Sequence, residues 1–467
     1  SDTRGGLARE LRVVRPGLED WQVLGAWALA DNQRYLEPMR LPGGAVGWLA
    51  FDGDRWQILK ATGNTLNVVM DCDCASVFSK RFGPSIKDDR FVFDLDGDGV
   101  DEVLLPAPQH LGAYRAPETQ GPLQLLWRSA WNEKGTPLLP DRKRPDHYNA
   151  RPRVLALPIG IRLNPLAGGG KAVPSSVLLV GEDSVGIVDS SGALPNTLPN
   201  TLPNTLSNNK SNTLSGAQPA PLLTPRRNVL AGLPPAGKGT VRAVHALEDM
   251  DGDGLPDVLH FTSLNADNVL KQKNEMRWYP GRMTDGRLHF GKADRLLASG
   301  GGSFADLLRL DGGGRPPYLL LVAQGEMSLS SVLQLLATKE ASFEMELYAW
   351  QPGHLGEKPT PAGNLTFKGL SNDGARPTLL AADLDGNGLR AVLVNTNADQ
   401  LSAFVPREGQ PLFGGAALAV GKVTLPVTGD TRFVTDADGD GKAELIFWHR
   451  KGANAQRETL TVVRYRP

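Results

Sequence analysis

One pattern recurs along this chain: an apolar run, an acidic turn rich in glycine, and a second apolar run. Four clear copies occupy residues 91–106, 246–261, 380–395 and 433–448. A fifth copy at 307–322 is degenerate, and Arg309 stands where the first acid is expected. Short apolar runs on both sides of a glycine turn favour strands joined as hairpins. A unit that returns several times indicates a repeat architecture.

Two further features accompany the turns. A phenylalanine, usually followed by glycine, precedes several of them, as at Phe82, Phe290 and Phe413. An aromatic run follows others, as at 276–281 and 347–353. Each unit therefore holds three or four strands, which is the content of one β-propeller blade. The 53 glycines and 35 prolines agree with many turns and short strands.

The blade count comes from adding two degenerate units to these five copies. Residues 150–190 hold two apolar runs without an acidic turn, and residues 20–60 hold a hairpin. We therefore predict an all-β fold, a single β-propeller domain over 1–467 with seven blades, and six or eight as alternatives. Because closure removes exposed edge strands, we expect N-terminal strand residues to share the blade built by 430–467.

An insertion interrupts the repeats. Residues 194–216 repeat the tetrapeptide Pro-Asn-Thr-Leu and carry almost no charge. Such a segment cannot bury a core, so we predict a low-complexity loop over 190–225. A neutral expansion of a surface loop and a binding arm are both consistent with this composition.

The acidic turns have a spacing that suits a metal ion. Counted from the first acid, carboxylates stand at positions 1, 3, 5 and 9, a backbone carbonyl at 7, and glycines at 4 and 6. The glycines allow the positive φ that a tight loop needs. The candidate ligands are Asp94, Asp96, Asp98, the Val100 carbonyl and Glu102; Asp249, Asp251, Asp253, the Leu255 carbonyl and Asp257; and Asp436, Asp438, Asp440, the Lys442 carbonyl and Glu444.

The charges explain why an ion is expected. Each close pair of carboxylates repels by about 1 kcal/mol in water and by about 4 kcal/mol at an effective dielectric of 20. A divalent cation removes this repulsion, and a shell made only of oxygen atoms favours Ca²⁺. The first half of the turn resembles an EF-hand loop, but the last acid falls at position 9 instead of 12, and strands replace the flanking helices. The alternative is an acidic turn without metal.

The remaining turns are weaker candidates. The third turn has Asp383, Asp385 and Asn387 but Ala391 at position 9, so its site should be weak or empty. In the fifth copy Arg309 and Pro317 replace the first and last acids, and no calcium is expected there. The sequence thus predicts about three strong calcium sites and one weak site.

The turns, together with the Phe-Gly dipeptides, resemble the FG-GAP or VCBS-type repeats of integrin-α-like β-propellers. The resemblance covers most of residues 80–467. It implies calcium in the inter-strand loops of the blades, an extracytoplasmic setting, and a role in adhesion, ligand binding or assembly. The chain departs from the family pattern near residues 40 and 160, where acidic turns are absent, and at Arg309 and Asp383.

Composition narrows the setting and the partners. A net charge of −1 gives no basic field for nucleic acid, and no apolar run is long enough to insert in a membrane. The numbered chain begins at Ser1, so we expect a removed leader and a secreted, periplasmic or cell-surface protein. Cys72 and Cys74 leave three states open: free thiols, a bridge between them, or bonds to a partner.

No catalytic motif stands out. The glycine run at 168–173 lacks the hydroxyl residue of a phosphate loop, and nucleophile-elbow and zinc-protease motifs are absent. We therefore expect a non-catalytic scaffold that binds another protein or a cell-surface assembly. The alternatives are a calcium-dependent, glycan-binding propeller of lectin type and an enzyme acting on polysaccharides.

Overall fold

The computed structural model describes most strands of the chain and the turns between many of them. The described residues are 9–16, 21–29, 35–52, 55–63, 65–72, 91–96, 98–118, 121–131, 153–156, 176–181, 183–189, 220–235, 237–251, 253, 255–267, 272–285, 287–293, 295–300, 304–309, 318–324, 337–338, 340–351, 354–355, 360–368, 379–388, 390–397, 400–405, 411–413, 418–422, 432–435, 441–450 and 458–463.

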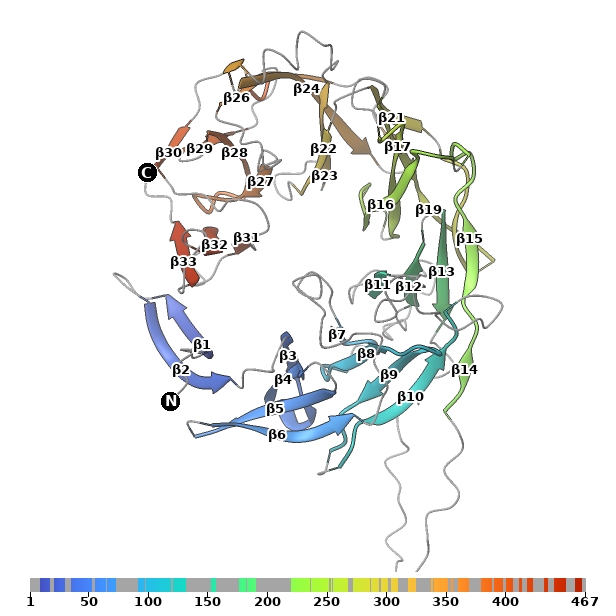
Figure 1. Cartoon of the computed structure of the whole chain (residues 1–467), viewed down its shortest axis with the longest axis vertical. Helices are drawn as coiled ribbons and strands as arrows, with labels where there is room; N and C mark the ends of the chain where they lie inside the picture. The colour runs from blue at the N-terminus through green and yellow to red at the C-terminus, as the bar shows by residue number, and fades with distance from the viewer. Residues whose placement is uncertain are drawn as a thin grey trace, which may run out of the picture. The chain divides into compact units, whose positions relative to one another are not determined.

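The fold is all-β, as the repeats predict. Strands dominate the described residues, and their longest helical element is the 3-10 turn Pro42–Gly44. None of the helical segments within the described part of the chain has the length and apolar character needed to span a membrane. The strands form antiparallel sheets from consecutive segments (Figure 1).

The chain divides into two compact units. The first comprises Ser1–Arg12, Gly25–Val229 and Met283–His289, and the second comprises Val13–Leu24, Leu230–Arg282 and Phe290–Pro467. Each unit is described by its own sheets.

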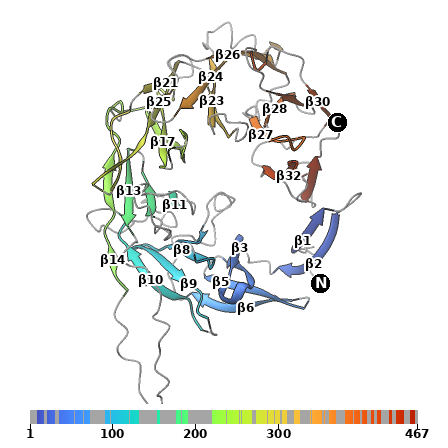
Figure 2. The same cartoon turned by 180° about the vertical axis from the view of Figure 1, so that it is seen from behind.

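Three sheets make up most of the first unit. They are β3 (Tyr35–Arg40), β4 (Val46–Phe51), β5 (Trp56–Thr62) and β6 (Thr65–Cys72); β7 (Val92–Phe93), β8 (Glu102–Pro106), β9 (Leu111–Arg115) and β10 (Gln124–Ser129), with β14 (Leu222–Leu223) added beside β10; and β11 (Arg153–Ala156), β12 (Ser176–Val180), β13 (Ser184–Asp189) and β15 (Arg226–Val229). In both views β8, β9 and β10 run side by side (Figures 1 and 2).

Four sheets make up most of the second unit. They are β16 (Val241–Glu248), β17 (Asp257–Leu264), β18 (Lys273–Tyr279) and β21 (Arg295–Gly300); β22 (Phe304–Arg309), β23 (Tyr318–Gln324) and β24 (Glu340–Gln351) with β25 (His354–Leu355) and β26 (Thr360–Lys368); β27 (Leu379–Ala382), β28 (Ala391–Asn397), β29 (Gln400–Phe404) and β30 (Leu418–Lys422); and β31 (Arg432–Thr435), β32 (Glu444–Arg450) and β33 (Glu458–Val463). The pair of β19 (Gly281–Thr284) and β20 (Arg287–Phe290) includes Met283–His289 of the first unit.

Apolar clusters pack one sheet against the next inside each unit. In the first unit, Leu104 of β8 and Trp127 of β10 share a cluster with Leu179 of β12. In the second unit, Leu393 of β28 shares a cluster with Leu445 of β32. The strand that follows an acidic turn therefore lies between two apolar layers and is buried on both faces, as all five residues of β8 are.

Both degenerate units of the sequence form complete sheets. Residues 35–72 form the sheet β3–β6. Residues 153–189 supply β11, β12 and β13, which are three of the four strands in the sheet completed by β15. The fifth copy of the repeat, which lacks the first and last acids, also forms two paired strands, β22 and β23. Apolar pairing across the strands is therefore enough to form these sheets without an acidic turn.

The predicted 190–225 loop ends earlier than expected. Residues 190–219 lie outside the described residues, but Leu222–Leu223 form the short strand β14. This strand runs parallel to β10, where the Arg128 amide donates to the Pro221 carbonyl at 2.9 Å. The exposed edge of β10 provides hydrogen-bonding groups that capture the end of the insertion, which composition alone does not reveal.

The N-terminal strands β1 (Arg9–Pro16) and β2 (Trp21–Leu29) form a two-stranded sheet of their own. Trp27 of β2 contacts Trp48 of β4, with ring centroids 5.8 Å apart, and its Nε1 donates to the Gly63 carbonyl at 3.0 Å. Among the described pairings, β31–β33 includes no N-terminal strand, so the shared closing blade stays a prediction.

The cysteine question has an answer in the structure. Cys72, at the end of β6, is disulfide-bonded. The only other cysteine in the sequence is Cys74, which lies outside the described residues. Of the three states that the sequence left open, a free thiol at Cys72 is therefore excluded.

Candidate metal-binding loops

The acidic turns share one framework, which the buried strand after each turn sets. The residue at position 9 opens that strand and is buried: Glu102 and Asp257 are 0% exposed, and Glu444 is 2% exposed. In the first loop a Glu102 oxygen accepts the Leu95 amide at 2.7 Å. In the second loop an Asp257 oxygen accepts the Met250 amide at 3.0 Å. The position-9 carboxylate thus ties the start of each turn to the core.

The odd-numbered carboxylates also accept backbone amides within the turn. In the first loop Asp96 accepts the Asp98 amide at 3.2 Å, and Asp98 accepts the Val100 amide at 2.8 Å. The second loop repeats both bonds, from the amides of Asp253 and Leu255 at 3.1 and 2.8 Å. These bonds hold the carboxylates of positions 3 and 5 against the backbone of the turn.

Glycine is needed where the backbone turns back. Gly99 has φ of 86°, and its amide donates to Asp94 at 3.1 Å. The equivalent Gly388 in the third loop has φ of 80° and donates to Asp383 at 2.9 Å. Residues other than glycine rarely adopt this left-handed backbone conformation, so the loop needs glycine at position 6.

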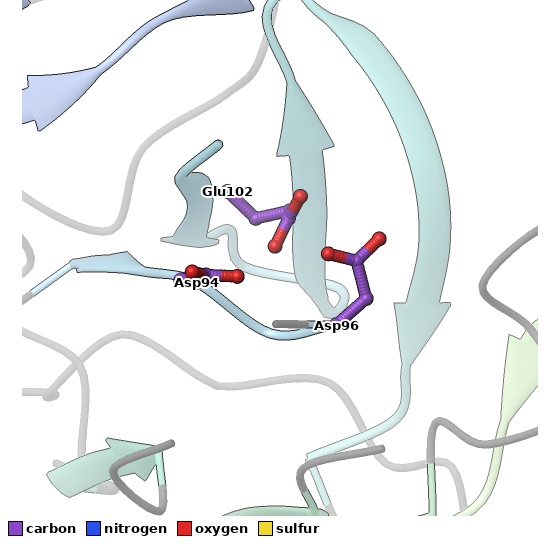
Figure 3. Close-up of side chains that lie close together, drawn as sticks. All are labelled: Asp94, Asp96 and Glu102. Atoms are coloured by element: carbon purple, nitrogen blue, oxygen red, sulfur yellow. The ribbon is translucent and has the colours of Figure 1, made fainter. Parts of the chain in front are cut away.

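Two groups of carboxylates come together closely enough to hold a cation. In the first loop, one oxygen each from Asp94, Asp96 and Glu102 lies within 4.8 Å of the others, and Figure 3 shows these carboxylates converging from the loop and from β8. Asp249, Asp251 and Asp257 meet the same criterion in the second loop. These are six of the residues that the spacing singled out.

The first loop already contains a positive charge, which the sequence analysis did not anticipate. Arg115, at the end of β9, contacts the Oδ2 atom of Asp96 at 2.6 Å and that of Asp98 at 3.2 Å. Its Nε donates to Glu102 Oε1 at 2.6 Å, and its Nη2 contacts the same oxygen. One guanidinium therefore contacts three of the four carboxylates expected to bind calcium.

A second arginine contacts the remaining carboxylate of this loop. Arg40, at the end of β3, donates from Nη2 to Asp94 at 3.1 Å and to Asp101 at 2.7 Å. Its backbone amide also donates to Asp101 at 2.6 Å, and its carbonyl accepts the Asp101 amide at 2.9 Å. These bonds attach the first loop to the neighbouring sheet.

Burial and charge act in opposite directions on Glu102. Burial raises the pKa of its carboxyl to about 7, while the Arg115 guanidinium and the Leu95 amide act to lower that pKa. Arg115 and the Leu95 amide therefore both favour the charged form of this buried carboxylate.

The second loop is arranged differently around its position-9 acid. Asp257 accepts the Met250 amide on one oxygen and the Gly281 amide, at 2.8 Å, on the other. Burial, followed by the charge of Asp251, raises the pKa of Asp257 to about 8. Burial also raises the pKa of Asp253 to about 6, with Asp251 and Asp249 adding repulsion. Burial and mutual repulsion therefore favour the protonated form of Asp257 near neutral pH.

The third and fourth loops are described less completely. In the third loop Asp385 and Asn387 are exposed and bond to each other at 2.9 Å, and the buried Ala391 provides no ligand at position 9. In the fourth loop Asp436, Asp438 and Asp440 lie outside the described residues, and Lys442 and Glu444 lie within them. Of the fifth copy, Arg309 ends β22 and Pro317 lies outside the described residues.

Comparison with known proteins assigns the chain to no family. No protein-family model matches the chain, and no curated protein matches it. Solved structures align over nearly the whole chain at low identity. The Photorhabdus luminescens Tc holotoxin pore aligns at 14% identity and a TM-score of 0.33, over 97% of this chain and 16% of that one.

Two other structures are similar to the same low degree. The V. cholerae biofilm matrix protein Bap1 aligns at 12% identity and a TM-score of 0.32, over 94% of this chain and 90% of its own. The α-L-arabinofuranosidase of Fusarium graminearum aligns at 12% identity and a TM-score of 0.31, over 98% of each chain. These TM-scores lie below 0.5, and the similarities establish no function.

Proposed function

We propose that the chain is a seven-bladed β-propeller, stabilised by calcium, that serves outside the cytoplasm as a non-catalytic scaffold for binding another protein or a cell-surface assembly. The observation that carries the calcium proposal is the convergence of Asp249, Asp251 and Asp257 at one turn.

The architectural part is supported by the sheets. Among the described residues, the sheets with three or more strands are those beginning at β3, β7, β11, β16, β22, β27 and β31, which is the number of blades expected from the repeats. Most are meanders of consecutive antiparallel strands, as propeller blades are. A closed propeller of this length should have a radius of gyration of about 23 Å. Small-angle X-ray scattering tests this value, and a clearly larger radius would indicate two separate units.

The calcium part is supported by the chemistry of the second loop. Its ligand atoms are all oxygen, two of its three converging acids are almost fully buried, and their mutual repulsion is strong at low dielectric. For extracellular calcium modules the dissociation constant is of the order of 10⁻⁴–10⁻³ M. Isothermal titration with CaCl₂ should show binding in this range.

The matched control uses the third loop. Asp251→Asn and Asp385→Asn change the same position of the same motif, but only the first lies beside a position-9 carboxylate. We expect Asp251→Asn to remove one calcium ion per chain and Asp385→Asn to leave the stoichiometry of the strong sites unchanged. A protein that retains no calcium after dialysis against millimolar CaCl₂ would contradict the proposal.

The extracytoplasmic setting is supported by the disulfide at Cys72, because such bonds persist in oxidising compartments. The binding role is tested by affinity purification from the native source with calcium and with chelator. A protein partner retained only with calcium would support the scaffold. A glycan-array signal or uronate release from a polysaccharide would instead favour the lectin or the enzyme.

A further inference from the structure

We propose that Arg115 is the resident cation of the first acidic loop, and that it keeps calcium out of a turn whose sequence matches a complete calcium site. The inference rests on the proposed function only in treating calcium as the ion that such loops accept. It concerns which of the loops is available to that ion.

The geometry shows how fully the arginines use the loop. Arg115 contacts Asp96, Asp98 and Glu102, and Arg40 contacts Asp94. Every carboxylate at positions 1, 3, 5 and 9 thus contacts a guanidinium. Two guanidinium groups carry the same charge as one calcium ion, so the loop gains its counter-charge from the chain itself.

The guanidinium and an ion would compete for the same oxygen atoms. Calcium needs oxygen ligands at about 2.3–2.6 Å and six to eight of them. The oxygens that Arg115 contacts are Oδ2 of Asp96, Oδ2 of Asp98 and Oε1 of Glu102. An ion placed among them would have to displace a positive, forked group that fits carboxylates in a bidentate manner. Arg115 therefore acts as a specificity determinant of this loop.

The register of the hairpin puts the arginine there. Glu102 and Arg115 are directly paired across β8 and β9. Across β17 and β18 the last pair is Val258 with Tyr279, so the residue beyond Tyr279 on the side of Asp257 is Pro280. A proline carries no charge, and the second loop has no arginine at this register position.

Space also differs at the second loop. The residue after Pro280 is Gly281, whose amide donates to Asp257. A Cβ atom at Gly281 would lie 2.2 Å from the Pro256 carbonyl oxygen, so no side chain fits at that position. The two residues that follow β18 are thus an uncharged proline and a glycine that no larger residue can replace, whereas β9 ends on Arg115, which contacts the first loop.

The test begins with the unmodified full-length chain. Hydrogen exchange is compared in CaCl₂ and in chelator for the amides of Leu95, Asp98 and Val100 and for those of Met250, Asp253 and Leu255. We expect at least tenfold slower exchange with calcium in the second set and no change in the first. Slowing in the first set would overturn the proposal. No change in either set would contradict calcium binding by the second loop, and the Arg115→Gln variant would then test the role of Arg115 by itself.

The variant is Arg115→Gln, which removes the charge but keeps a polar side chain. Calorimetric titration with CaCl₂ should show one more ion per chain than in the unmodified protein, and this ion should disappear when Asp96→Asn is added. Equal stoichiometry and affinity before and after Arg115→Gln would overturn the proposal, even if the second loop binds calcium normally. If Arg115→Gln fails to fold in chelator, recovery of its circular dichroism in CaCl₂ supports the proposal, and failure to recover contradicts it.

Discussion

Asp257→Asn is the change that most directly separates a metal ligand from a structural acid in the second loop. Asp257 is fully buried and accepts two backbone amides, from Met250 at 3.0 Å and Gly281 at 2.8 Å. Asparagine has nearly the same shape but only one oxygen. One of the two amides will then face an amide nitrogen and lose its acceptor.

The expected loss in the free energy of unfolding for Asp257→Asn has two contributions. An unsatisfied buried amide costs about 1–3 kcal/mol, with or without calcium. Loss of an ion with a dissociation constant of the order of 10⁻⁴–10⁻³ M costs about 1–2 kcal/mol more in about 5 mM CaCl₂. In chelator, Asp257→Asn also removes the cost of protonating this acid on folding, since burial raises the pKa of Asp257 to about 8, and this gain partly offsets the first cost. The variant should therefore lose about 2–5 kcal/mol in calcium and clearly less in chelator.

Urea unfolding, followed by tryptophan fluorescence, measures the loss of stability in calcium and in chelator. Trp278 on the neighbouring strand is fully buried and reports on unfolding near the loop. Asp183→Asn is the control, because Asp183 pairs with Arg227 at 3.3 Å on the surface, where such pairs contribute about 0–1 kcal/mol. The control should change little in either condition. An equal loss for Asp257→Asn with calcium and with chelator would show that this residue supports the turn without binding an ion.

Four further outcomes are expected. In chelator, the free energy of unfolding should fall as pH rises from about 4 to about 8, because the folded state holds a proton on Asp257 that the unfolded state releases; calcium should flatten this dependence, and a flat profile in chelator would contradict it. Gly281→Ala should lower the urea midpoint, since its Cβ meets the Pro256 carbonyl oxygen at 2.2 Å, and an unchanged midpoint would refute the close approach. Deletion of residues 1–30 should destabilise or aggregate the protein by removing the contact of Trp27 with the β3–β6 sheet, as size-exclusion chromatography would reveal. In the last repeat the pairing of β32 with β33 ends at Leu445 with Val463, and the next residues along the chain are Glu444 and Arg464, the latter outside the described residues. Arg464→Gln should therefore increase calcium binding, measured by titration, and unchanged binding would contradict a blocking role for this arginine.

Local spacing made the loops predictable. The turn is defined within nine residues, and glycine, carboxylate and strand positions follow from backbone rules that act over that distance. The sequence thus located the clusters of Asp94, Asp96 and Glu102 and of Asp249, Asp251 and Asp257 without any structure. Alternating apolar runs likewise predicted an all-β fold and even the sheets that lack an acidic turn.

The contents of the loops were decided by contacts that spacing does not encode. Arg115 reaches the first loop because the β8–β9 hairpin pairs it with Glu102, and a shift of one residue would turn its side chain to the other face. Arg40 reaches Asp94 because two sheets pack together, and β14 joins β10 across the whole insertion. Register and sheet packing depend on the summed burial of many side chains. The sequence by itself therefore determined where the acidic turns lie, and only the tertiary structure decided which charge each turn meets.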